Sequence, residues 1–158
     1  MATTVQAVPQ DDLMLLLSQA THTLNTELTA ALAGLGISPR AHCVLSKAMP
    51  GDLTQTQLAE LAGLDKTTMV ATIDELERAG LAERRPSAKD RRVRIIAVTD
   101  AGRRMVADAQ TIVDRIHDEV LAALPEPQRH AFLEALAQLV AGPLCHPVQC
   151  GRPVRRPI

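Results

Sequence analysis

Aromatic side chains are almost absent from this sequence of 158 residues. It contains no tryptophan, no tyrosine and one phenylalanine, although 46% of its residues are hydrophobic. Leucine, alanine and valine must therefore fill the core. The length predicts one domain that is large enough to bury a sizeable core of its own.

Long apolar runs and paired cysteines are also lacking. No stretch of 18 or more uncharged apolar residues occurs, so we expect no membrane-spanning segment and no membrane partner. Residues 1–12 show no basic segment followed by an apolar one, so we expect no signal peptide. Three cysteines, an odd number, argue against a disulfide framework and favour a reducing, cytoplasmic location.

Motifs of catalysis are missing as well. The sequence has no P-loop, no GxGxxG and no HExxH. His42 and Cys43 are neighbours in an expected helix, where their side chains diverge by about 100° and cannot form a nucleophile–base pair. We therefore predict that the protein is not an enzyme and needs no cofactor.

Charge is distributed unevenly along the chain. The formal net charge is −1, but residues 78–104 contain nine basic and three acidic residues. This segment therefore carries +6 and the remainder −7. A basic patch on an acidic body is the electrostatic footprint of a phosphate-binding surface, so nucleic acid is the predicted partner.

Residues 53–80 carry the pattern of two short helices. Apolar residues recur at steps of three and four on both sides of a tight link that contains Gly63. Thr56 and Asp65 are the expected N-caps, and Gly80 is the expected end of the second helix. Two short helices joined in this way are typical of a helix-turn-helix.

A change of period follows this pair of helices. Residues 81–85 and 93–98 are strand-like, and residues 86–90 between them are rich in turn formers. Together the segments predict a winged helix within 37–99.

Leucine-rich helical patterns lie on both sides of the winged helix. They span residues 11–36 and 100–142, the latter interrupted at Pro125 and Pro127. Because this is more leucine than one small winged helix needs, we expect these helices to interleave with a second chain; a thick monomeric core is the alternative. Residues 1–10 are expected to be flexible, and residues 143–158, rich in proline and arginine, to form a loose tail.

The order of these motifs resembles the MarR family, the multiple-antibiotic-resistance type of bacterial transcription regulators. The resemblance covers about Leu13 to Val140 and implies a mainly α fold with a small β-hairpin wing. It also implies an obligate homodimer that binds a pseudo-palindromic operator in double-stranded DNA and most often represses transcription. The matching residues are Thr54-Gln55-Thr56-Gln57-Leu58-Ala59, Leu76-Glu77-Arg78-Ala79-Gly80-Leu81, Asp90-Arg91-Arg92 and Val98-Thr99-Asp100-Ala101-Gly102.

DNA-contacting residues are predicted on the second helix and on the wing. In the family pattern an aspartate braces the arginine two places on, which enters the minor groove; here these are Asp90 and Arg92. Many relatives hold a guanine-reading arginine where this chain has Ala71, so direct readout is expected to rely on thymine contacts. The predicted DNA-binding residues are Thr56, Lys66, Thr67, Thr68, Val70, Ala71, Arg84, Arg85, Lys89, Asp90, Arg91, Arg92 and Arg94.

The resemblance also implies a small-molecule effector, since relatives bind phenolic or carboxylate compounds between the long helices and the winged helix. Candidate ligand residues are His22, Arg40, His42 and Ser46, because imidazole and guanidinium groups suit such compounds.

Other readings of the chain remain open. Cys145 and Cys150 could act as a thiol sensor, whereas Cys43 is expected to be an inert core thiol. Cys145, His146 and Cys150 lack a rigid geometry for metal, so no metal site is predicted. A winged helix that binds protein alone is a further alternative, but it would lack the arginine-rich wing.

Overall fold

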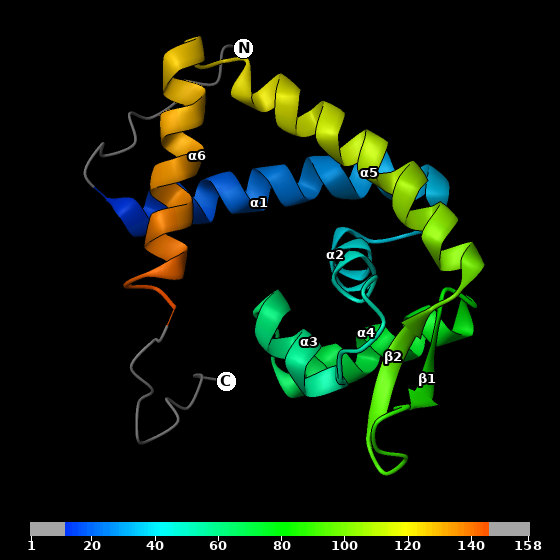
Figure 1. The fold of residues 1–158 in the computed structure, drawn as a ribbon. Helices are drawn as coiled ribbons and strands as arrows, with labels where there is room; N and C mark the ends of the chain where they lie inside the picture. The colour runs from blue at the N-terminus through cyan, green and yellow to red at the C-terminus, as the bar shows by residue number, and fades with distance from the viewer. Residues whose placement is uncertain (1–11, 146–158) are drawn as a thin grey trace, which may run out of the picture. The chain divides into compact units, whose positions relative to one another are not determined.

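The computed structural model describes residues 12–145. The chain divides into two compact units, with the boundary between Ile116 and His117. The predicted flexible start and most of the predicted tail lie outside these residues. As predicted, the described chain is mainly α-helical with one small β-hairpin (Figure 1). In chain order the elements are α1 (Leu13–Leu32), the 3-10 turn η1 (Ala33–Leu35), α2 (Pro39–Lys47), α3 (Gln55–Ala62), α4 (Lys66–Arg78), β1 (Ala82–Pro86), β2 (Arg94–Val98), α5 (Asp100–Leu121) and α6 (Glu126–Ala141).

The ends of the first two helices follow directly from local sequence. The Asp12 carboxylate accepts a hydrogen bond from the backbone N–H of Leu15 (2.9 Å) and caps α1. Ser38 caps α2 in the same way, and Pro39 occupies the first helical position, where a missing N–H costs nothing. Between the two helices, Gly36 takes a left-handed conformation (φ 71°), and the chain bends by 79° from the first helical segment to α2.

The N-cap of α3 differs from the prediction. Thr54, not Thr56, is the cap, and it forms a capping box in which the Gln57 side chain bonds back to the Thr54 N–H (2.9 Å). Thr54 has the extended backbone that a cap requires, whereas Thr56 lies inside the first helical turn. Asp65 caps α4 as predicted, accepting from the N–H of Thr68 at 2.9 Å.

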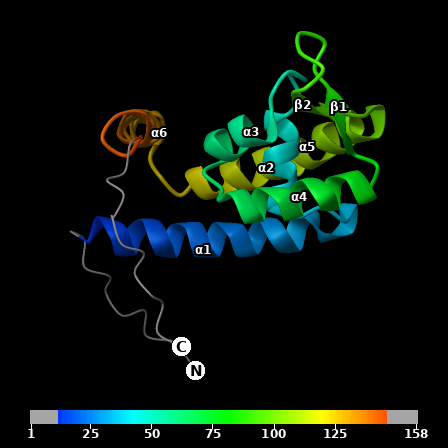
Figure 2. The same ribbon diagram turned by 90° about the horizontal axis from the view of Figure 1, so that it is seen from below.

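The β-hairpin is joined to the helices at its base. β1 and β2 pair antiparallel, from Ala82 opposite Val98 to Pro86 opposite Arg94. The loop before α3 adds a short third partner, because the N–H of Ile96 donates to the carbonyl of Leu53 (2.9 Å). Figure 2 shows the hairpin tip standing clear of the helices of the first unit.

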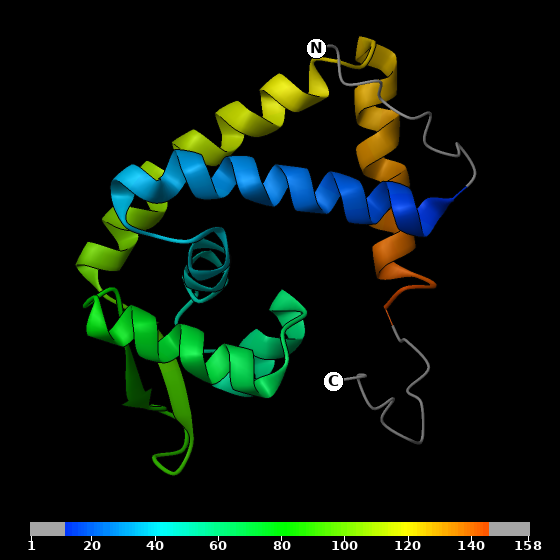
Figure 3. The same ribbon diagram turned by 180° about the vertical axis from the view of Figure 1, so that it is seen from behind.

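The core of the first unit lies between α2, α4 and the base of the hairpin. Seen from behind, α2 runs between α1 and α4 (Figure 3). Each helix buries one face, and the strands bury their inward-pointing positions. Almost all of the buried side chains are aliphatic. The largest fully buried ones are Leu32, Val44, Leu45, Leu58, Met69, Ile73, Leu76 and Ile96.

The described part of the second unit, residues 117–145, has no such core. None of the residues of α6 is buried, and its apolar residues Phe132 and Val140 are 49% and 58% exposed. No single helix among residues 12–145 has the length and apolar character to cross a membrane. One bent pair, residues 13–35 with α2, meets that test by length and composition only, and in this structure α2 is a core helix.

Candidate nucleic-acid interface

One face of α4 is free for contact with a partner. Met69, Ile73 and Leu76 are buried beneath the helix and fix its orientation. On the opposite side Lys66, Thr67 and Ala71 are exposed, and Val70 is half-buried. Helix α4 therefore presents a short positive and methyl-bearing surface at its N-terminal end.

Thr68 is tied into the cap of the same helix. Its hydroxyl donates to the Asp65 carboxylate at 2.6 Å, and its N–H donates to the other oxygen of that group at 2.9 Å. These hydrogen bonds lower the pKa of Asp65 below its ordinary value. Thr68 thus orders the start of α4, while Thr67 beside it remains exposed.

The tip of the hairpin is held by backbone contacts rather than by ion pairs. The Asp90 carboxylate accepts from the N–H of Arg92 (2.9 Å), and the Asp90 carbonyl accepts from the N–H of Val93 (3.0 Å). The expected brace thus acts on the backbone of Arg92; no ion pair joins the two side chains in the described structure. Lys89, Arg91 and Arg92 are exposed at this tip.

Two arginines of β1 are already paired within the protein. The guanidinium of Arg84 binds the carboxylates of Asp74 (2.7 Å) and Glu77, and it also donates to the side chain of Gln55 (3.2 Å). Arg85 pairs with Glu83. The phosphate role predicted for Arg84 does not fit this geometry, because its donors are engaged on α3 and α4. Arg94, one strand away, is exposed.

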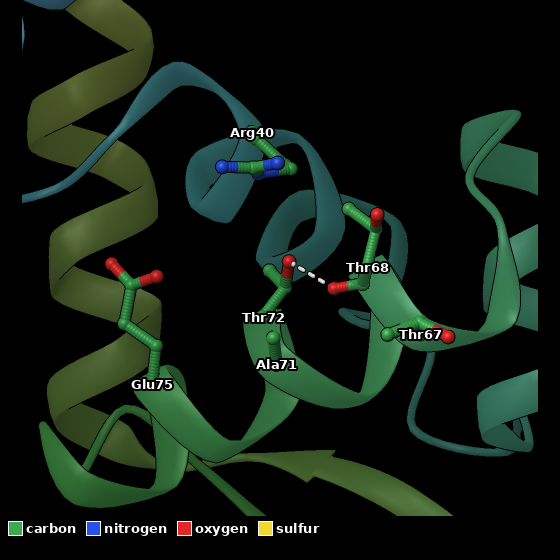
Figure 4. Close-up of a pocket in the computed structure, with 6 residues that line it drawn as sticks. All are labelled: Arg40, Thr67, Thr68, Ala71, Thr72 and Glu75. Atoms are coloured by element: carbon green, nitrogen blue, oxygen red, sulfur yellow. Dashed lines mark hydrogen bonds between the residues drawn. The ribbon is translucent and has the colours of Figure 1, made fainter. Parts of the chain in front are cut away.

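Arg40 lies beside α4 rather than among the other candidate ligand residues. It projects from the start of α2 over a hollow of about 230 Å³, which Thr67, Thr68, Ala71, Thr72 and Glu75 also line. Figure 4 shows its guanidinium over Thr68 and Thr72, with the Glu75 carboxylate to one side. A residue predicted to bind an effector is thus adjacent to residues predicted to bind DNA.

The other ligand candidates are only partly brought together. His42 and Ser46 are one helical turn apart in α2, and the His42 Nε2 lies 3.2 Å from the Ser46 hydroxyl. His42 is buried, which lowers its pKa, and the Asp114 carboxylate on α5 partly offsets this shift. His22 is exposed on α1, in a shallow hollow lined only by α1 residues.

The structure describes two of the three cysteines. Cys43 is half-buried and Cys145 is exposed, both as free thiols, and Cys150 lies outside the described residues. Among residues 12–145, no three His, Cys, Asp or Glu side chains are arranged to hold a metal ion.

Sequence reasoning missed the partners of Arg84 and the reason for Gly102. The pairings of Arg84 with Gln55 and Asp74 span 29 and 10 positions, and no local pattern signals them. A Cβ at Gly102 would lie 2.0 Å from the carbonyl oxygen of Leu81, so α5 can begin against the hairpin base only at a glycine. The sequence signal that could have indicated this requirement is the position of Gly102 at the end of the Val98-Thr99-Asp100-Ala101-Gly102 motif.

A capped helix-turn-helix that is followed by a basic antiparallel hairpin defines a winged helix-turn-helix DNA-binding protein. The model of the MarR family matches residues 35–93. A MarR-family transcriptional regulator from Rhodococcus sp. RHA1 is 31% identical, with 87% of this chain and 98% of that one covered at a TM-score of 0.76. The chain therefore belongs to the MarR family of transcriptional regulators.

Two further relatives have been solved with ligands. CouR from Rhodococcus jostii RHA1, bound to p-coumaroyl-CoA, is 30% identical over 91% of this chain and 100% of that one (TM-score 0.74). The Mycobacterium tuberculosis MarR-family protein Rv2887, in complex with p-aminosalicylic acid, is 28% identical over 84% and 98% (TM-score 0.67). A structure of a transcriptional repressor named CouR, bound to a 23-mer DNA duplex, is 27% identical over 85% of this chain and 99% of that one (TM-score 0.73).

Proposed function

We propose that the protein is a homodimeric repressor that binds a pseudo-palindromic operator and leaves it when a small aromatic or carboxylate compound binds. One observation carries the DNA-binding part of this proposal. The exposed N-terminal turn of α4 and the arginine-bearing hairpin tip belong to one compact unit, in which Arg84 of β1 is hydrogen-bonded to Asp74 and Glu77 of α4. A major-groove reader and a minor-groove reader can therefore meet DNA together.

On this proposal α4 reads the major groove. Lys66 and Thr67 contact phosphates or base edges, and Val70 and Ala71 contact thymine methyl groups. Thr56, exposed in the first turn of α3, faces a backbone phosphate. With alanine at position 71, base recognition in the major groove is modest, so the remaining specificity must come from DNA shape.

The wing supplies that second source of specificity. Arg92 enters the minor groove, where a narrow A·T-rich segment has enhanced negative potential. Lys89, Arg91 and Arg94 bind phosphates on either side, since they are exposed and carry no ion pair within the described residues. Arg85 contributes less, because Glu83 neutralises part of its charge.

Arg40 is better assigned to DNA than to the effector. It borders the same hollow as Thr67 and Ala71, which belong to the proposed major-groove surface. No hydrogen bond or ion pair of its side chain is found in the described structure, so its guanidinium is available to a phosphate at the edge of the groove.

Two exposed apolar surfaces support the dimer. On α1, Leu13 and Met14 are 55% and 74% exposed, and α6 exposes Phe132, Leu133 and Val140. Exposed apolar residues gathered on one helix are typical of a protein–protein contact. A palindromic operator requires a two-fold dimer with its reading helices about one DNA turn apart, so residues 11–36 and 100–142 are proposed as the dimerisation helices.

The effector class rests on the relatives that were solved with p-coumaroyl-CoA and p-aminosalicylic acid. Both ligands contain an aromatic ring and an acyl or carboxyl group. In this chain, aliphatic side chains would have to form the walls of the pocket, and His42 with Ser46 offers polar groups within α2. A regulator of this kind acts on DNA, so we propose a cytoplasmic location.

The test is binding of the purified protein to the DNA upstream of its own gene. Fluorescence anisotropy with that duplex and with a shuffled duplex of equal composition, over a range of salt, gives affinity, specificity and salt slope. Salicylate, p-coumarate and p-coumaroyl-CoA are then added separately, as are a reductant, an oxidant and a chelator.

Tight specific binding with a steep salt slope, relieved only by the aromatic acids or the thioester, is the expected result. Release by oxidant alone would move the switch to the cysteines, and release by chelator would move it to a metal. Equal affinity for both duplexes would refute the repressor proposal and favour a winged helix that binds protein.

A further inference from the structure

Arg84 differs from the other basic residues of the hairpin in what its side chain binds. Its guanidinium contacts Asp74 and Glu77 on α4 and Gln55 on α3, and its backbone N–H donates to the Glu77 carboxylate at 2.7 Å. Only 29% of the side chain is exposed. We call Gln55, Asp74, Glu77 and Arg84 the Arg84 cluster.

The Arg84 cluster joins three elements that the proposed function requires to act together. Gln55 begins the helix before the reading helix, Asp74 and Glu77 belong to the reading helix, and Arg84 belongs to the wing. A planar guanidinium offers several donors in a fixed geometry, so pairing with two carboxylates and an amide defines direction as well as distance. A lysine at this position would keep the charge but lose that geometry.

Asp74 supplies the second argument. It is exposed on α4, near the proposed DNA surface, where an unpaired carboxylate would repel phosphate. Its carboxylate is 2.7 Å from the Arg84 guanidinium, which offsets part of the negative charge of Asp74 and Glu77. One oxygen of Asp74 is therefore held by Arg84, and the carboxylate is not a bare negative charge beside the DNA backbone.

From this geometry, and resting on the proposed DNA-binding function, we infer that Arg84 is a positioning residue. It sets the spacing and angle between α4 and the wing, so that the major-groove and minor-groove contacts are made in one register. Arg84 does not bind a DNA phosphate. Loss of the cluster should therefore reduce binding to the operator and leave binding to unrelated DNA almost unchanged.

The salt dependence of binding separates positioning from phosphate contact. Each phosphate contact that is lost lowers the salt slope by about one unit and weakens all sequences alike. We expect Arg84→Met and Arg84→Lys each to lower operator affinity by about tenfold, the scale of one lost charge-assisted hydrogen bond. The salt slope and the affinity for a shuffled duplex should stay at the wild-type values in both variants.

Lys89→Met is the matched control, because Lys89 is an exposed cation on the same hairpin. It should lower the salt slope by about one unit with both duplexes. If Arg84→Met behaves like Lys89→Met while Arg84→Lys binds normally, Arg84 is a phosphate contact and the inference is wrong.

For Asp74→Asn, a purely electrostatic effect and a positioning role of the Arg84 cluster predict opposite changes in operator affinity. Removing a negative charge near the DNA should raise affinity if only electrostatics matter. If the cluster positions the wing, operator affinity should fall instead, although the net charge becomes more favourable. Higher operator affinity for Asp74→Asn would overturn the inference.

A measurement without DNA tests the positioning role of Arg84 separately from the proposed repressor function. Hydrogen–deuterium exchange of the free protein should show faster exchange over residues 82–98 in Arg84→Lys than in the wild type, with α1 unchanged. Unchanged exchange in the hairpin would refute the positioning role even if the protein bound no operator. Failure of the wild type to bind DNA, with faster hairpin exchange in the variant, would refute the proposed function alone.

Discussion

At the hairpin tip, an ordered backbone holds a charged side chain that is exposed and makes no ion pair in the described structure. Asp90 holds the N–H of Arg92 at 2.9 Å, which orders the backbone at the tip, while the Arg92 side chain stays exposed. An arginine whose backbone is already in place loses less conformational entropy when it enters a groove. The hairpin tip is therefore suited to binding DNA, and the Arg84 cluster is suited to aligning α4 with the hairpin.

Arg92→Ala should abolish specific DNA binding and leave the fold intact. The side chain is exposed and makes no ion pair in the described structure, so its removal costs the folded protein little. Anisotropy with operator and shuffled duplexes at physiological salt measures the effect, and circular dichroism checks the fold. Unchanged operator affinity would contradict the minor-groove role.

His42 makes stability depend on pH. Burial lowers its pKa below the ordinary 6.5, although the Asp114 carboxylate acts in the opposite direction. Below pH 6.5 the unfolded chain therefore takes up a proton more readily than the folded one. The contribution of neutral His42 to stability is complete above pH 6.5 and is lost as the pH falls through the lowered pKa.

His42→Gln should therefore lose less stability on acidification than the wild type. Glutamine does not titrate, and its amide can replace the imidazole contact with Ser46. Urea unfolding of both proteins at about pH 7.5 and about pH 5.5, on either side of the ordinary histidine pKa, measures the difference. Equal losses in the two proteins would mean that His42 does not contribute to the pH dependence.

At the scale of elements, α5 begins in close contact with the base of the hairpin. Thr99 joins the two, because its hydroxyl donates to the Gly80 carbonyl (2.7 Å) and accepts from the Gly102 N–H (3.0 Å). A Cβ on Gly102 would lie 2.0 Å from the Leu81 carbonyl oxygen and 2.8 Å from a methyl group of Val98. The backbone of α5 or of the hairpin must move to admit it.

Gly102→Ala should consequently destabilise the protein by about 1–3 kcal/mol, the usual cost of overpacking. Gly34→Ala is the matched control, since a Cβ there meets nothing within 4 Å and the backbone is not left-handed. That control should be neutral or more stable by up to about 1 kcal/mol. Urea unfolding at one protein concentration compares the two variants, and equal stabilities would refute the steric argument.

Elements were easier to predict than the contacts between them. Asp65 is the cap that the sequence predicted, because cap chemistry involves neighbours within three residues, and Asp12 and Ser38 cap α1 and α2 by the same local chemistry. The prediction of Thr56 failed, although Thr54 followed by Gln57 was the better local signal for a capping box.

At the candidate site, exposure of Lys66 and Arg92 follows from helix period and turn chemistry, so sequence alone indicated them. The pairing of Arg84 and the position of Arg40 beside α4 depend on how distant segments pack. A single sequence does not contain that information in local form.

At the scale of the whole molecule, the described chain leaves one helix without a core. Helix α6 has no buried residue, and Phe132 and Leu139 are 49% and 37% exposed. These two positions are seven residues apart, so they lie on the same side of the helix. If this surface packs against a second copy, as proposed, it is the place where a charge should separate the dimer.

The double variant Phe132→Glu with Leu139→Glu should therefore be a monomer. Analytical ultracentrifugation at micromolar concentration should show half the wild-type mass, and the helical circular dichroism signal of the first unit should persist. The control, Ala131→Glu with Gln138→Glu, adds two negative charges with the same spacing at exposed positions on another side of α6 and should stay dimeric. Operator affinity should then fall only in the monomeric variant, because two half-sites need two linked reading helices. A variant that stays dimeric, or a monomer that binds the operator as tightly as the wild type, would contradict the proposed assembly.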